Sequence, residues 1–353
     1  MQKNIIATIF AFVGVISLSQ CKKTTDATVS DSFTAIAAAF GVNINPQNPY
    51  NYASQTKPAY ITKDNTAGNI IINAKATIGR VLFYDKQLSI NNTVSCASCH
   101  KQEFAFSDTA LVSKGVEGGL TGRHSMRLVN SRFGTEMRFF WDERAASLEA
   151  QTTQPIQDHA EMGFSGKEGR PNFATLLTKL KAVGYYNELF KWAYNDTEIT
   201  ETRMQECLSQ FIRSIQSFDS KYDAGRAAVN NDGQNFPNFT ALENQGKSLF
   251  LQPPAFDGLG RRIGGGLGCG GCHRAPEFDI DPNSGNNGIV AVANSLAGID
   301  VNNTRTPSLR DITNNAGAVN TAFMHTGSLK SLEAVIDHYN NNNRVAGNNR
   351  LDP

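Results

Sequence analysis

The sequence lacks several features that would each point to a class of function. Lys and Arg number 33 against 32 Asp and Glu, and the net charge of +1 gives no electrostatic case for nucleic-acid binding. The apolar run at residues 5–18 is too short to span a bilayer. Charged residues make up only 18% of the chain, whereas Gly and Asn are abundant. This composition predicts a loop-rich protein whose interior is partly filled by something other than side chains.

Cysteine and histidine are also scarce, with six of each in 353 residues. Four of the cysteines and two of the histidines nevertheless occur in two short stretches, CASCH at 96–100 and CGGCH at 269–273. Two thiols three positions apart, followed at once by an imidazole, are the attachment signature of a c-type haem. The sequence therefore predicts two covalently bound haems, with histidine as the axial ligand of each iron, held by Cys96, Cys99, His100, Cys269, Cys272 and His273. A structural zinc site or a redox dithiol is the alternative, but zinc knuckles normally lie close together in the sequence.

The N-terminus predicts export. Residues 1–21 have the layout of a secretory signal peptide, with Lys3 before the apolar run and Cys21 at its end. Cys21 resembles the lipidated residue of a bacterial lipoprotein, although Gln20 departs from the small residue usual before it. Residues 22–73 are expected to form a tether and an N-terminal extension. We therefore expect a periplasmic protein that is lipid-anchored to a membrane through Cys21.

Apolar periodicity and capping signals predict helices at 76–84, 171–183, 185–194, 201–218, 240–251 and 331–340. Cys207 falls in the apolar stripe of the fourth of these and is expected to be an inert core thiol. The polar segment 223–239 is predicted to be a domain boundary, and the Gly-rich segment 258–268 a flexible loop that leads to the second cysteine motif.

The stretch IGRVLFYDKQLSINNTVSCASCH, residues 78–100, resembles the entry to the first haem of bacterial dihaem cytochrome c peroxidases and their relative MauG. The pattern continues, with gaps, from about residue 74 to residue 339. The resemblance implies a mainly α protein of two cytochrome c-like haem domains, a peroxidatic domain at 74–225 and an electron-transfer domain at 240–353. Because the family usually continues into one more amphipathic helix, we expect the sequence to be incomplete at its C-terminus.

The stretch FFWDERAASLEAQTTQPIQDHAEMGF, residues 139–164, extends the resemblance. Trp141, Gln151 and Glu161 match residue types that the family shows at the same separations. The resemblance implies that Trp141 lies between the haems, whereas Gln151 and Glu161 line the pocket in which peroxide binds.

A carboxyl group above the iron can take the proton from the inner peroxide oxygen and return it to the outer one. We expect Glu161 to have this role and Gln151 to position the peroxide by hydrogen bonding. The alternatives are that Glu161 faces solvent or pairs with an arginine, and that Trp141 is simply a core aromatic. His159 is expected to be a surface or loop histidine.

The sixth ligand of the second iron divides the family. It is a methionine in the peroxidases and a tyrosine in MauG-like members. The matching position here is Tyr339, which we prefer as ligand, with Met324 as the alternative. Tyr339 also shares a helical face with apolar residues, so a core tyrosine is a further alternative.

Two departures from the family concern the loop after the first motif. Many of these peroxidases have a histidine there that blocks the iron, at a position that falls near Val116. No histidine occurs between His100 and His124, so we expect a first haem that is open to peroxide without prior reduction. The family also holds calcium through an asparagine after the loop arginine. His124 follows Arg123 here and is a poor calcium ligand, so calcium is doubtful. His124 could instead bond a haem propionate.

Three functions follow from the resemblance. The first is a cytochrome-c peroxidase (type EC 1.11.1.5) that reduces hydrogen peroxide with electrons from a small cytochrome c or copper protein. The second is a MauG-like enzyme that oxidises a protein or organic substrate. The third is an electron carrier without catalysis. Members of the family often dimerise, so a homodimer is one expected assembly, but the sequence alone does not determine the oligomeric state.

Overall fold

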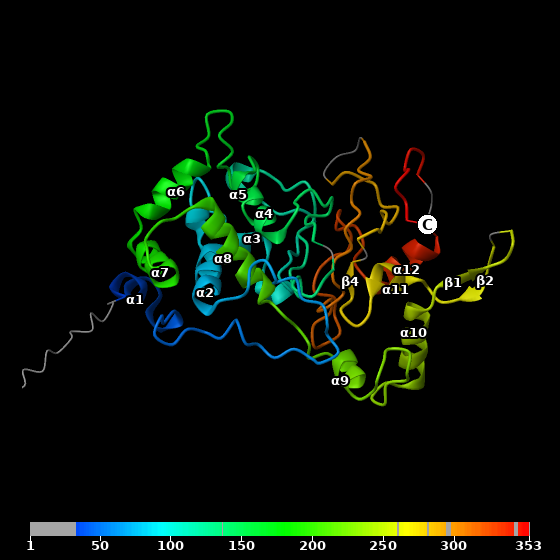
Figure 1. The fold of residues 1–353 in the computed structure, drawn as a ribbon. Coiled ribbons are helices and arrows are strands. Elements are labelled where there is room, and N and C mark those ends of the chain that lie inside the picture. Colours follow the sequence, from blue (N-terminus) through cyan, green and yellow to red (C-terminus); the bar gives the residue numbers. More distant parts are fainter. Residues whose placement is uncertain are drawn as a thin grey trace, which may run out of the picture. The chain divides into compact units, whose positions relative to one another are not determined.

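The computed structural model describes residues 33–135, 137–259, 261–280, 282–293, 298–341 and 345–352. The predicted signal peptide at 1–21, Cys21 and the first part of the expected tether lie outside these ranges. In the described ranges helices are the main regular elements and are joined by long loops (Figure 1), in agreement with a largely helical fold. Each of these helices is too short or too polar to cross a bilayer.

The described helices are α1 (Thr34–Phe40), α2 (Asn73–Tyr84), α3 (Cys96–Cys99), α4 (Leu148–Thr152), α5 (Gln154–Gln157), α6 (Phe173–Lys181), α7 (Gly184–Tyr194), α8 (Glu201–Arg213), α9 (Lys221–Ala227), α10 (Ala241–Leu251), α11 (Cys269–Cys272) and α12 (Leu332–Asn340). The strands are β1 (Pro254–Phe256), β2 (Arg262–Gly265), β3 (His273–Arg274) and β4 (Asp279–Ile280). They pair as two antiparallel ladders, β1 with β2 and β3 with β4.

The main hydrophobic core is built around α2 and α8, which lie against each other (Figure 1). Gly79 of α2 faces the backbone of Cys207 in α8. A Cβ at Gly79 would lie 1.9 Å from the Cys207 carbonyl oxygen, so only glycine permits this close approach. Cys207 is fully buried, and this burial raises the pKa of its thiol to about 12, as expected of an inert core cysteine.

The six predicted helices are present, with shifted ends. The largest shift is in α8, which was expected to reach residue 218 but ends at Arg213. The reason is that the Asn130 side chain bonds the backbone N–H and C=O of Ser217 and holds that segment outside the helix. The capping box that starts α10, between Thr240 and Glu243, is confirmed.

Two segments contain regular structure that the sequence did not predict. The expected boundary at 223–239 contains part of α9, because Asp223 is buried and bonds Tyr60 and Arg310 from distant parts of the chain. The segment 258–268, which was expected to be a flexible loop, contains β2, and this strand pairs with β1 through an irregular register. Gly-rich strands lack the alternation of apolar and polar residues that predicts a hairpin.

The C-terminal part of the chain has little apolar core of its own. In its described residues from 240 to 352, the buried apolar side chains are Val290, Ala322 and Phe323. Large apolar side chains remain partly exposed on α10, on α12 and before α11, namely Leu249, Leu267, Leu332, Ile336 and Tyr339. Their apolar surface is available to a ligand in this region.

Polar contacts join this part to the N-terminal part within one unit that begins at Phe33. The Arg123 guanidinium lies 2.8 Å from the Asp300 carboxylate, and the Lys63 ammonium lies 2.7 Å from that of Asp279. The division into haem domains at 74–225 and 240–353 stays a prediction.

Candidate functional site

The two cysteine motifs adopt the same backbone conformation. Each forms one helical turn, α3 or α11, and the histidine that follows caps this turn with its backbone N–H on the first cysteine. The φ and ψ angles are −114° and 77° at His100, and −110° and 77° at His273. Each motif thus places two thiols that form no disulfide on one turn, with an imidazole next to them. Among the described residues, no group of three or more His, Cys, Asp or Glu is arranged around a common metal site.

His100 is fixed in a tautomer that suits an axial ligand. Its Nδ1 lies 2.8 Å from the carbonyl oxygen of Phe106, and because a carbonyl only accepts, Nδ1 carries the proton. Burial of the ring lowers the pKa of His100, so the imidazole is neutral at neutral pH. The lone pair on Nε2 is then available to an iron ion.

His273 has different partners. Burial of its ring, and then the charge of Arg127, lower the pKa of His273 to about 3, so this imidazole is neutral as well. Its Nδ1 is buried and has no hydrogen-bond partner among the residues that the structure describes. The second motif therefore also supplies a neutral imidazole. Among the described residues, however, no carbonyl orients this ring as the Phe106 carbonyl orients the ring of His100.

The structure brings Glu161 within electrostatic range of the first motif. Burial raises the pKa of both Cys96 and Cys99, and the nearby charge of Glu161 raises each of them further. Asp158 builds the turn that places Glu161 there, because its carboxylate accepts a hydrogen bond of 3.0 Å from the Glu161 backbone N–H. Burial, and then the charge of Asp158, raise the pKa of Glu161 to about 7. A carboxyl group with this pKa can both take up and release a proton near neutral pH.

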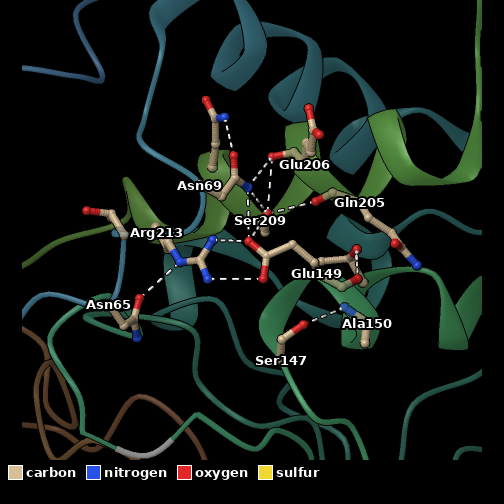
Figure 2. A network of polar contacts seen from close by, with 12 residues as sticks. Asn65, Asn69, Ser147, Glu149, Ala150, Gln205, Glu206, Ser209 and Arg213 are labelled. Carbon is tan, nitrogen blue, oxygen red and sulfur yellow. Dashed lines mark hydrogen bonds and ion pairs between the residues drawn. The ribbon is translucent and has the colours of Figure 1, made fainter.

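An ion pair with a buried arginine holds α4 against α8. Figure 2 shows the guanidinium of Arg213 facing the carboxylate of Glu149, with Asn69 and Ser209 on the same carboxylate. Asn65 accepts a hydrogen bond of 3.0 Å from Arg213 Nε on the other side. Burial opposes ionisation, yet the hydrogen bonds from Arg213 and Asn69 lower the pKa of Glu149 to about 2.

Gln151 lies on this anchored helix, two residues after Glu149. Its backbone N–H donates to the Ser147 carbonyl at 3.0 Å, within the first turn. Its side chain is partly buried and forms no hydrogen bond in the described part of the chain. An amide without a partner on a fixed helix can orient a small polar ligand, and the role of Gln151 stays a prediction.

Trp141 lies where the N-terminal and C-terminal parts of the chain meet. Its indole N–H donates to the His124 carbonyl oxygen at 2.8 Å, and its own carbonyl accepts from the Arg305 N–H at 3.0 Å. Its ring centroid is 6.2 Å from that of His325. Trp141 is therefore packed between the two parts, as a relay residue must be.

The two candidates for the sixth ligand of the second iron meet at one asparagine. Asn287 donates to the sulfur of Met324 at 2.8 Å and also hydrogen bonds the Tyr339 side chain. Burial of the hydroxyl, and then the charge of Cys272, raise the pKa of Tyr339 to about 12, so this hydroxyl lies within electrostatic range of the second motif. With 49% of its surface exposed, Tyr339 is not a core residue of the protein alone.

The loop after the first motif packs beside Glu161. Val116 is buried at the expected position of the blocking histidine, and its N–H donates to the Glu161 carbonyl at 3.0 Å. His124 is buried, with Nδ1 2.9 Å from the Ala110 carbonyl, and its Nε2 has no partner in the described ranges. The bond from His124 to a propionate stays a prediction. His159 is partly exposed in a turn, as expected.

Sequence reasoning did not find three residues that shape these sites, Phe106, Asn287 and Arg127. Phe106 acts through its backbone carbonyl and Asn287 through a short amide, and no motif marks either role. Arg127 did carry a signal, because it is the only charged residue in the stretch SMRLVN at 125–130. A single charge in an otherwise uncharged segment is a reason to look for a ligand of the opposite charge.

This chain is similar to several known proteins. A family model described as di-haem cytochrome c peroxidase matches residues 73–230. A methylamine utilization protein MauG of Methylorubrum extorquens is 31% identical over 287 residues, which cover 77% of this chain and 70% of the relative. A cytochrome c551 peroxidase of Nitrosomonas europaea is 26% identical over 57% of this chain and 52% of its own. A crystal structure of a MauG-like protein associated with microbial copper homeostasis is 25% identical, with a TM-score of 0.61 over 84% of this chain and 85% of that one.

Proposed function

Because the chain belongs to the dihaem cytochrome c peroxidase and MauG family of oxidoreductases, we propose that it reduces hydrogen peroxide to water. The observation that carries this proposal is the position of Glu161, a partly buried carboxyl with a pKa of about 7 beside the first cysteine motif. Each turnover takes two electrons and two protons and releases two water molecules.

Six residues would hold the haems. Thioether bonds would form at the four motif thiols, and the imidazoles of His100 and His273 would bind the irons. Both rings are neutral, which fits an axial ligand, and the partly exposed apolar side chains around the second motif fit a porphyrin face. Haem iron supplies the redox chemistry when it is bound.

The chain itself would supply proton transfer and positioning. Glu161 would take the proton from the inner peroxide oxygen and return it to the outer oxygen as the O–O bond breaks. The free amide of Gln151 would hold the peroxide by a hydrogen bond, and the ion pair of Glu149 and Arg213 would keep its helix in place. Val116 puts no iron ligand into this pocket.

Electrons would enter through the second haem. A small cytochrome c or copper protein in the periplasm is the proposed donor, and Trp141, packed against His325 and bonded to His124, would shorten the route between the haems. Export, and a lipid anchor on Cys21, belong to the same proposal.

A second function is a MauG-like oxidation of a protein or organic substrate. The observation that favours it is Tyr339, whose hydroxyl lies beside the second motif and whose phenolate would favour the ferric state of that iron. In this case the oxidising equivalents of peroxide would oxidise the substrate instead of a donor protein.

The test compares the Glu161→Gln holoenzyme with wild type in peroxide turnover, with a reduced cytochrome c and with no donor. We expect a loss of about 10²- to 10⁴-fold at unchanged haem content, because the acid–base group is removed. Glu168→Gln is the matched control, since that carboxylate is largely exposed on the same segment. Unchanged turnover in Glu161→Gln would contradict the assignment. Turnover of an organic substrate, but not of cytochrome c, would favour the second function, and no peroxide turnover in wild type would leave only the electron carrier.

A further inference from the structure

Arg127 is a cation without a matching anion in the described part of the chain. Its Nε is buried and has no hydrogen-bond partner. Burial lowers the pKa of Arg127 to about 10, and the carboxylate whose charge reaches it, Asp311, forms no ion pair with it. A buried charge without a partner is strongly destabilising, so a fold that retains one normally binds a counter-ion.

The backbone of Arg127 borders the first motif. Two residues earlier, the Ser125 hydroxyl donates to the Cys99 carbonyl at 2.7 Å and lies 3.3 Å from Nδ1 of His100. The carbonyl of Met126 also bonds the His100 ring. The segment 125–127 therefore begins next to His100, which is the expected proximal ligand of the first iron.

The side chain of Arg127 extends towards the second motif. Its guanidinium donates to the Thr321 hydroxyl at 3.3 Å and lies 5.6 Å from the centre of the Phe323 ring. Its charge also acts on His273. Arg127 is thus a positive charge between the two proximal histidines, and its head group lies on the side of the second.

Two buried nitrogen atoms lack a partner at this place. Nε of Arg127 is a donor, and Nδ1 of His273 is a ring nitrogen of the proximal ligand itself. A ligand that satisfies an unpaired guanidinium must be an acceptor, and an anion compensates its charge as well. A haem attached at Cys269 and Cys272 would carry two propionate carboxylates, which are acceptors of this kind.

We propose that Arg127 binds a propionate of the second haem and thereby raises the reduction potential of that iron. This inference rests on the proposed dihaem function. A positive charge near the iron disfavours the more positive ferric state, so the ferrous state becomes easier to reach. Replacement of Arg127 would remove this positive charge and would also leave the negative charge of the propionate uncompensated. Each of these changes lowers the reduction potential of the second iron.

The experiment is a spectroelectrochemical titration of the holoenzyme that resolves the two haems. In Arg127→Gln we expect the ferrous-to-ferric ratio of the second haem to fall about tenfold at a fixed potential, or about 59 mV for one electron. Arg127→Lys retains the charge and should recover most of this loss. Arg203→Gln removes an arginine that pairs with Asp196 at the surface of α8, and it should change neither potential.

A wild-type measurement covers the case in which Arg127→Gln fails to incorporate haem. Infrared spectra of holoenzyme that carries ¹³C-labelled propionates should show one carboxylate that stays ionised below the ordinary carboxyl pKa of about 4.3. The inference is overturned if all propionates protonate at ordinary values, if Arg127→Gln leaves the second potential unchanged, if only the first haem shifts, or if Arg127→Lys loses as much as Arg127→Gln. None of these readouts depends on peroxide turnover. A failure of the inference about Arg127 can therefore be distinguished from a failure of the proposed function.

Discussion

The two Cys-x-x-Cys-His turns have nearly the same backbone but very different surroundings. The first lies against the core of α2 and α8, and the Phe106 carbonyl orients the ring of His100. Within the described part of the chain, the second lies in a region with few buried apolar side chains, and Nδ1 of His273 has no hydrogen-bond partner. The comparison teaches that the motif specifies the attachment turn, whereas the rest of each site depends on what packs around it.

The two surroundings also differ in chemistry. Beside the first turn lies a carboxyl group, Glu161, that can exchange protons near neutral pH. Beside the second lie Tyr339 and Met324, which can donate an oxygen or a sulfur to iron, and Asn287 contacts both. The first site is thus equipped for proton transfer and the second for ligation.

The largest expected effect comes from removing each attachment in turn. Cys269→Ala with Cys272→Ala should halve the haem content and expose residues 240–352 to protease, because this part has little core of its own. Cys96→Ala with Cys99→Ala should also halve the haem content but leave the core of α2 and α8 protected. Haem absorbance and limited proteolysis with mass mapping measure both. Equal protection of the two parts from protease in both variants would contradict the proposed difference between the two sites.

The next effect concerns the pH dependence of peroxide reduction. Because the pKa of Glu161 is raised to about 7, its base form is lost as the pH falls through this value. We expect kcat/KM for peroxide to rise with pH through about 7 in wild type and to be low and flat in Glu161→Gln. Stopped-flow kinetics across this range measure it. The absorbance of the second haem should not change with the titration of Glu161. A change of that absorbance with the same pKa would contradict the difference between the two sites.

The ion pair that anchors α4 gives a stability effect confined to the first region. Glu149→Ala leaves the Arg213 guanidinium buried without its partner and should cost about 3–5 kcal/mol. Glu149→Leu with Arg213→Met should recover most of this loss. The Glu149 pKa is lowered to about 2, so its stabilisation is present above the ordinary value of about 4.3 and is lost as the pH falls towards 2. Urea unfolding at several pH values measures both effects, and equal losses in the single and double variants would be the contrary result.

The smallest effect distinguishes the two ligands offered to the second iron. Tyr339→Phe should abolish phenolate-to-iron absorbance and favour the ferrous state of the second haem, whereas Met324→Leu should leave the spectrum unchanged. Electronic and spin-resonance spectra of the holoenzyme measure this. The opposite pattern would assign the ligand to Met324. In both variants the first haem should keep an open position, because no histidine occurs between His100 and His124.

Much of the local structure was predictable from the sequence because it depends on neighbouring residues. The capping box of Thr240 and Glu243 starts α10 where expected, and Ser331 starts α12. The end of α8 was not predictable, because it is set by Asn130, which is far away in the sequence. The same is true of α9, where the buried bond between Asp223 and Arg310 stabilises a segment that looks like a linker.

The sequence by itself determined the family and the two Cys-x-x-Cys-His turns, and it predicted which residues would surround them. These follow from short spacings, which local backbone geometry converts directly into structure. Only the tertiary structure decided that Glu161 lies within electrostatic range of the first pair of thiols and that Asn287 joins Met324 to Tyr339. It also decided that Arg127 acts on His273 and has no ion-pair partner among the described residues. Burial and charge at these places come from segments that are distant in the sequence, and no local pattern records them.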